Sequence, residues 1–281
     1  MFQWGLFLCL VLVCIPGLLT AVRSAMVLII RLGESALPAG ETLPPRTVIL
    51  VATMIQTLAL ITISAAVGTT LAHQVGFGAP FFGALIGVSS PWLAFKIQLL
   101  PALEIGAGGA LLFLAAYYGF FRPRLDETTV EQMETLRNEL GFAGRVLYGG
   151  IAEEVITRWG LLTVLVWLGY KLSGTQSPTT IWIAIILAGI LFGLGHLPGY
   201  LAAGCRLSPM FLLMMLSLNL WASLLFGWLF WHVGLLAAML AHSIFHLLWY
   251  PFDRYHWRCG LGRSNANGVE DSLQWKSIHV L

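Results

Sequence analysis

The sequence predicts an all-α fold, a polytopic membrane helix bundle of about seven transmembrane helices with an eighth as the alternative. Of the 281 residues, 58% are hydrophobic and only 10% are charged, which is not the composition of a water-soluble chain. The apolar residues also gather in charge-poor runs of ~20 residues or more, the length that a helix needs to cross a bilayer. The formal net charge of +2 gives no indication of a nucleic-acid partner.

The first three spans are expected at residues 2–30, 48–72 and 99–121. The first of them has neither the basic start nor the small-residue cleavage site of a signal peptide, so we interpret it as a membrane span. Residues 75–97 are apolar but interrupted by Gly and Pro. That pattern predicts a re-entrant or interfacial segment, with an eighth span as the alternative.

Four further spans are expected between residues 141 and 252. The fourth covers 141–169 and the fifth covers 181–203. Residues 207–252 contain no Asp, Glu, Lys or Arg, which predicts two spans joined by a tight turn near Trp231 to Gly234.

Polar segments flank the predicted spans. Residues 122–139 begin a stretch with apolar residues at helical spacing, which predicts a short amphipathic helix on the inner membrane face. These apolar residues are Val130, Met133, Leu136 and Leu140. Residues 253–281 are polar and predict a flexible tail, so the chain divides into a transmembrane bundle at 1–252 and a C-terminal tail.

Lysine and arginine predict the orientation of this integral, multi-pass protein in a cytoplasmic-type membrane. An N-terminus outside and a C-terminus inside leave only Lys171 and Lys96 on the outer side. The inner side then collects Arg31, Arg46, Arg122, Arg124, Arg137, Arg206, Arg254, Arg258, Arg263 and Lys276.

Three charged side chains, Glu153, Glu154 and Arg158, lie inside the fourth span. A charge at mid-bilayer costs roughly 2.5–3.5 kcal/mol, so these residues need a compensating structure or a function. Glu154 and Arg158 are four residues apart and can pair on one helix face, whereas Glu153 is rotated ~100° away. An ion-pair cluster that joins helices is the alternative to a functional site, and the second, unpaired acid argues against it.

Three histidines lie in the later spans. His242 and His246 share one helix face, so two imidazoles can address one point. Phe192 precedes His196 by the same interval, and Pro198 ends or kinks that helix just beyond it. A single imidazole that bonds a neighbouring carbonyl is the ordinary alternative for His196.

The ordered motifs are E-E-x-x-x-R at Glu153, F-x-x-x-H ending at His196, and H-x-x-x followed by a polar residue at His242. In this order and in charge-poor spans, they resemble the CAAX prenyl endopeptidase and bacteriocin-processing family of intramembrane, glutamate-type proteases. The resemblance covers residues 141–250. It departs at His246, where that family usually has Asn.

The resemblance implies an intramembrane endopeptidase that hydrolyses a peptide bond near the membrane surface with a glutamate- and histidine-activated water. Its candidate catalytic residues are Glu153, Glu154, Arg158, His196, His242 and His246. We expect Glu153 to be the general base and His196 to hold the water. His242 and His246 would donate hydrogen bonds to the oxyanion, while the ion pair of the fourth span positions the site.

No cofactor is expected, and the partners are the lipid bilayer and a membrane-proximal peptide or protein substrate. Zinc is the alternative, because three imidazoles and a carboxylate form a legitimate ligand set: Glu153, His196, His242 and His246. The absence of an H-E-x-x-H sequence argues against that zinc-dependent metalloprotease. A non-catalytic membrane scaffold of the same superfamily would not need the acidic pair. A proton-relay transporter would predict inverted repeats, and none is visible.

Overall fold

The computed structural model describes residues 2–36, 43–87 and 89–266. Within these ranges the chain is helical and contains no strand, so the predicted all-α fold is confirmed. Six of the described helices are long and apolar enough to cross a membrane, which makes the chain a multi-pass membrane protein. They are Trp4–Met26, Arg46–Val75, Pro91–Arg124, Pro178–Ala202, Pro209–His232 and Leu235–His256.

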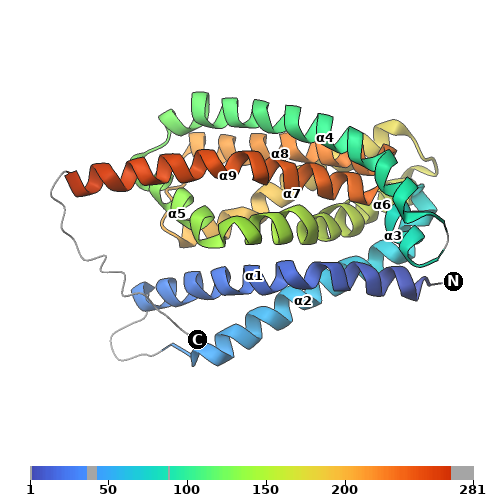
Figure 1. Cartoon of the computed structure of the whole chain (residues 1–281), viewed down its shortest axis with the longest axis horizontal. Coiled ribbons are helices and arrows are strands. Elements are labelled where there is room, and N and C mark those ends of the chain that lie inside the picture. The colour runs from blue at the N-terminus through green and yellow to red at the C-terminus, as the bar shows by residue number, and fades with distance from the viewer. Residues whose placement is uncertain (1, 37–42, 88, 267–281) are drawn as a thin grey trace.

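The first half of the chain forms the helices α1 to α4. They span Trp4–Ala36 (α1), Arg46–Leu71 (α2), Pro80–Leu85 (α3) and Pro91–Ala116 (α4), with the 3₁₀ turn η1 (Ala72–Val75) after α2. α1 packs against α2, and Figure 1 shows this pair along one side of the bundle. α3 has six residues and a length of ~9 Å, which is too short to cross a membrane. The segment 75–97 therefore does not supply an eighth span.

α5 (Glu127–Gly144) follows α4 after the short turns η2 (Tyr117–Phe121) and η3 (Arg122–Arg124). The Asp126 side chain caps it by accepting a hydrogen bond from the backbone N–H of Thr129 at 3.0 Å. α5 packs against α1 and α9 and buries Arg137. α5 thus has a buried face, where a carboxylate in α9 compensates the Arg137 charge inside the bundle, and its expected position at the inner membrane face stays a prediction.

The predicted fourth span is a continuous helical run of unusual geometry. It consists of η4 (Arg145–Ala152), one α-helical step at Glu153 and Glu154, η5 (Val155–Leu162) and α6 (Thr163–Ser173). Both η4 and η5 are π-helical. This run is not among the six apolar helices, but Figure 1 shows it along the bundle, from α5 to α6. Together with those six it agrees with about seven spans.

The last three helices form the predicted fifth to seventh spans: α7 (Pro178–Ala202), α8 (Pro209–His232) and α9 (Leu235–Ala266). The turn between α8 and α9 lies at Gly234, whose φ of 123° suits glycine, so the predicted tight turn is confirmed. α9 continues beyond the expected boundary at residue 252 and ends at Ala266. Residues 267–281 of the predicted tail lie outside the described residues.

The arginine-rich ends of the helices gather at one end of the bundle. Figure 1 shows the end of α1, the start of α2 and the end of α9 at this end, and the N-terminus at the other. This arrangement agrees with the expected topology, while the side of the membrane that this end faces stays a prediction.

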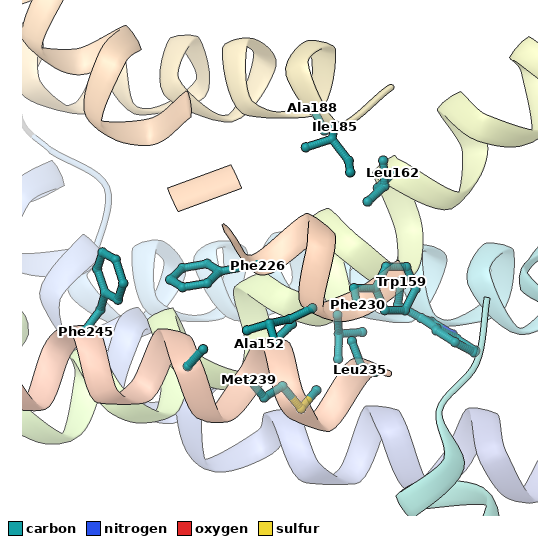
Figure 2. Packing of buried hydrophobic residues seen from close by; sticks show 14 of the residues in the cluster. Ala152, Trp159, Leu162, Ile185, Ala188, Phe226, Phe230, Leu235, Met239 and Phe245 are labelled. Atoms are coloured by element: carbon teal, nitrogen blue, oxygen red, sulfur yellow. The ribbon is translucent and has the colours of Figure 1, made fainter. Parts of the chain in front are cut away.

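Aromatic packing holds α8 and α9 together beside the fourth span (Figure 2). The rings of Phe226 and Phe245 are 5.0 Å apart, and those of Trp159 and Phe230 are 6.1 Å apart. All four side chains are buried. This layer fixes the relative positions of the helices that carry the polar residues described next.

Candidate functional site

A cavity of about 190 Å³ lies inside the bundle and has charged and polar groups in its wall. Among the wall residues are five of the six candidate catalytic residues: Glu153, Arg158, His196, His242 and His246. The sixth, Glu154, is fully buried behind them. The structure thus brings residues from the fourth span, α7 and α9 to one cavity, although they are far apart in the sequence.

Glu154 is held by two cationic or polar partners. Its Oε1 accepts a hydrogen bond from Nδ1 of His242 at 2.7 Å. Its Oε2 lies 3.3 Å from Nε of Arg158, in the ion pair expected from their spacing, although these two atoms lack hydrogen-bond geometry. Arg158 also donates to the hydroxyl oxygen of Thr157 at 2.6 Å. Glu154 is therefore engaged within the protein and unavailable to a substrate.

Glu153 is the acid that faces the cavity. It is half-buried, and it is the only Asp or Glu among the described residues of the cavity wall. Its backbone carbonyl accepts a hydrogen bond from the Thr157 hydroxyl at 2.6 Å, but its carboxylate has no hydrogen bond or ion pair within the described part of the chain. The two adjacent acids therefore have different environments.

The π-helical turns place this acidic pair between two distorted segments. A π-helical turn is wider than an α-helical one, and such turns occur frequently at functional sites. Gly149 and Gly150 in η4 lie against α9, where added β-carbons would meet His246 and Ser243. The absence of side chains at these two positions allows the acidic helix and the histidine helix to approach closely.

Hydrogen bonds assign the tautomers of two histidines. Nδ1 of His196 lies 2.8 Å from the backbone carbonyl of Phe192, which can only accept, so this nitrogen carries the hydrogen. Nδ1 of His242 likewise donates to the carboxylate of Glu154. In the neutral rings, Nε2 of both histidines is therefore an acceptor.

His246 differs from the other two histidines. Its ring stacks on that of His242 with centroids 4.9 Å apart. Its Nδ1 is buried and has no hydrogen-bond partner among the described residues. This nitrogen therefore retains its hydrogen-bonding capacity within the described part of the chain.

A second polar cluster at the same cavity was missed by the sequence interpretation. Asp253 of α9 accepts hydrogen bonds from Nε of Arg137 at 2.9 Å and from Nη1 of Arg145 at 2.7 Å. The arginine distribution predicts Arg137 in an inner loop, and the composition predicts Asp253 at the start of the tail. The signals available were weak: Arg145 begins the fourth span, and Asp253 is the first charged residue after the long apolar run. Asn219 of α8 also lines the cavity, and no motif or spacing in the sequence indicates this position.

The cavity does not present a formed metal site. Among the described residues, no three or more His, Cys, Asp or Glu side chains are arranged to hold one metal ion. Glu153, His196, His242 and His246 share the cavity wall without converging on one point. The arrangement does not fit a zinc ion, and the zinc alternative stays a prediction for experiment.

Residues 138–248 match the family model described as type II CAAX prenyl endopeptidase Rce1-like. The match begins in α5 and ends in α9, so it includes the acidic pair, Arg158 and the three cavity histidines. No curated protein and no solved structure matches the chain significantly. The family match supports a membrane-bound protease and confirms the resemblance predicted from the sequence. Over residues 138–248 the chain is thus similar to the Rce1-like type II CAAX prenyl endopeptidases.

Proposed function

We propose that the chain is an intramembrane endopeptidase that hydrolyses a peptide bond near the membrane surface with a water activated by Glu153. The observation that carries this proposal is the difference in environment between the two adjacent acids, Glu153 and Glu154. Glu154 is held by His242 and Arg158, whereas Glu153 is the acid open to the cavity. A carboxylate without an internal partner can accept a proton from water, which a paired one does less readily.

The water would be oriented by acceptors on two sides. One of its hydrogens points to Glu153 and the other to Nε2 of His196 or His242, the acceptor nitrogens in the neutral rings. The water oxygen then attacks the carbonyl carbon while Glu153 takes the proton. Glu153 returns this proton to the leaving amine nitrogen as the C–N bond breaks, which yields one carboxylic acid and one amine.

The oxyanion of the tetrahedral intermediate needs a donor, and His246 is the residue proposed to supply it. Its Nδ1 is buried without a partner, and a buried donor gains most from the charge that develops in the transition state. Asn219 can add a second donor, because its amide gives one hydrogen to the Met215 carbonyl at 2.7 Å and retains another. His242, tied to Glu154, would hold the water rather than the oxyanion.

The lipid bilayer and a membrane-proximal peptide are the proposed partners. The cavity combines these polar groups with apolar side chains such as Leu218 and Phe245. A peptide with apolar side chains fits such a wall, while its carbonyl groups meet the donors.

Glu153→Gln tests the proposal, with cleavage of a panel of fluorescently tagged membrane peptides as the measurement. The substitution keeps the size of the side chain and removes its basicity, so we expect a rate at least ~100-fold lower and unchanged membrane insertion. Glu104→Gln is the matched control, because Glu104 is exposed on α4 and outside the cavity. Wild-type turnover in Glu153→Gln would contradict the glutamate-base mechanism.

A further inference from the structure

Arg158 is within helical reach of both acids of the fourth span. It follows Glu154 by four residues and Glu153 by five. The segment η5, which contains Arg158, is π-helical. In a π-helical turn the backbone hydrogen bond joins residues five apart, so such residues lie on the same side of the helix. Spacing alone therefore allows Arg158 to pair with either acid, and a further contact must select Glu154.

The Thr157 hydroxyl supplies this contact. Nη1 of Arg158 donates a hydrogen bond to Oγ1 of Thr157 at 2.6 Å. The bond from Nη2 of Arg158 to the backbone carbonyl of Ala222 is longer, at 3.5 Å. Nε of Arg158 has no hydrogen-bond partner among the described residues. Within the described part of the chain, the shortest hydrogen bond of this guanidinium is therefore the one to Thr157.

The hydrogen of the Thr157 hydroxyl is also committed. Thr157 donates it to the backbone carbonyl of Glu153 at 2.6 Å, and a hydroxyl has only one hydrogen, so its lone pairs serve Arg158. Thr157 and Arg158 are each only 2% exposed, so bulk water does not replace the hydroxyl if it is lost. Two consecutive hydrogen bonds thus connect the Arg158 guanidinium to the backbone of Glu153.

Loss of this hydroxyl would leave Nη1 of Arg158 without its acceptor. Arg158 and Glu153 both line the cavity, and Glu153 is the only Asp or Glu among the described residues of its wall. A guanidinium released from Thr157 would form its strongest new bond with that carboxylate. A carboxylate that is paired with a positive charge takes a proton from water less readily.

We propose that Thr157 is a positioning residue that holds Arg158 beside Glu154 and thereby keeps Glu153 free to act as the base. This inference rests on the proposed function and names the residue that makes the two acids different. Thr157 is not among the residues that line the cavity, so it acts through Arg158 rather than on the substrate.

Removal of the hydroxyl at nearly constant size tests this role. Thr157→Val should lower kcat for the tagged membrane peptides roughly tenfold to 100-fold and leave KM within about twofold, because only proton transfer is impaired. Thr157→Ser keeps the hydroxyl and should restore kcat to within about threefold of the wild type.

Thr53→Val is the matched control. Thr53 is buried on α2, and its hydroxyl makes the same type of hydrogen bond, to the carbonyl of Ile49 four residues earlier, at 2.8 Å. Thr53 is not among the cavity-lining residues. The control should therefore lower the thermal unfolding midpoint about as much as Thr157→Val does, while it keeps the wild-type kcat.

A second measurement needs no catalysis. Each full-length protein in detergent micelles is compared by infrared difference spectroscopy with the same protein carrying Glu153→Gln, which isolates the carboxylate stretch of Glu153. We expect Thr157→Val to shift this band, because the carboxylate then binds a guanidinium, and Thr157→Ser to leave it at the wild-type position. If Thr157→Val does not fold, Thr157→Ala removes the same hydroxyl with a smaller side chain.

An unshifted band in the variant without the hydroxyl, or a kcat equal to that of the wild type, would overturn the positioning role. A loss of kcat that Thr157→Ser shares would also overturn it. Failure of the proposed function is a separate outcome, in which the wild type cleaves no peptide. The infrared band would then still decide whether Thr157 keeps Arg158 away from Glu153.

Discussion

Gly149 lies directly against the imidazole of His246: a β-carbon at Gly149 would come within 2.5 Å of Nε2. The fourth span and α9 are thus in contact through a glycine and the ring of a proposed oxyanion donor. No side chain separates the two helices here, so the position of the His246 ring depends on the absence of a side chain at Gly149.

Gly149→Ala should therefore displace His246 and lower the cleavage rate. We expect a loss of roughly tenfold to 100-fold, because a misplacement of ~1 Å in a catalytic group has effects of this size. Gly108→Ala is the control, since a β-carbon there would have open space on the surface of α4. The measurement is the cleavage rate per folded protein. Equal rates for Gly149→Ala and the wild type would show that the His246 position is not critical.

Glu154→Gln should destabilise the protein, in contrast to Glu153→Gln. It removes the carboxylate that holds Arg158 and His242, and all three side chains are at least nine-tenths buried. Removing one partner of a buried ion pair costs about 3–5 kcal/mol. Thermal unfolding in detergent should show a clearly lower midpoint, with Glu104→Gln as the control on exposed α4. Unfolding midpoints that agree among all these variants would refute a structural role for Glu154.

His246 separates the metal-free reaction from the zinc alternative. As an oxyanion donor it needs only an N–H, so His246→Asn should retain most activity, while His246→Leu should lose roughly 10²–10³-fold. As a zinc ligand it needs a lone pair, and His246→Asn would then lose metal and activity together. We expect well under one zinc per chain and no effect of a chelator. Stoichiometric zinc, with activity lost to chelator and restored by zinc, would establish the metalloenzyme.

The proposed topology can be tested by cysteine labelling in a background without native cysteines. A cysteine at Ser264, near the end of α9, should be protected from an impermeant reagent in intact cells and react after lysis. A cysteine at Ser173, the exposed last residue of α6, should react in intact cells. The opposite pattern would reverse the orientation predicted from the arginine distribution.

Local spacing accounts for what the sequence could predict. The pair of Glu154 and Arg158 follows from four-residue helical spacing, and the turn at Gly234 follows from the length of an apolar run. The shared face of His242 and His246 has the same origin. Each of these features depends on neighbours within one or two elements.

Contacts between distant segments account for what the sequence could not predict. Arg137 and Asp253 are 116 residues apart, and nothing in either neighbourhood indicates the partner. Without that partner, the pattern of α5 predicts an amphipathic helix but not the ion pair that its buried face makes with α9. The π-helical turns around Glu153 also lack a periodic signal, because they depend on packing against α1, α2 and α9 rather than on local propensity.

α9 carries four of its polar groups along a single stripe. His242, His246, Trp249 and Asp253 recur at intervals of four, three and four residues, and the rings of His246 and Trp249 are nearly parallel, with 5° between their planes. Residues at this spacing share one face of a rigid rod, so they rotate together about its axis. A twist of α9 would withdraw the histidines and the indole from the cavity and displace the Asp253 anchor at the same moment. A disturbance in the packing of this one helix should therefore inactivate the proposed site as a unit, rather than weaken it one group at a time.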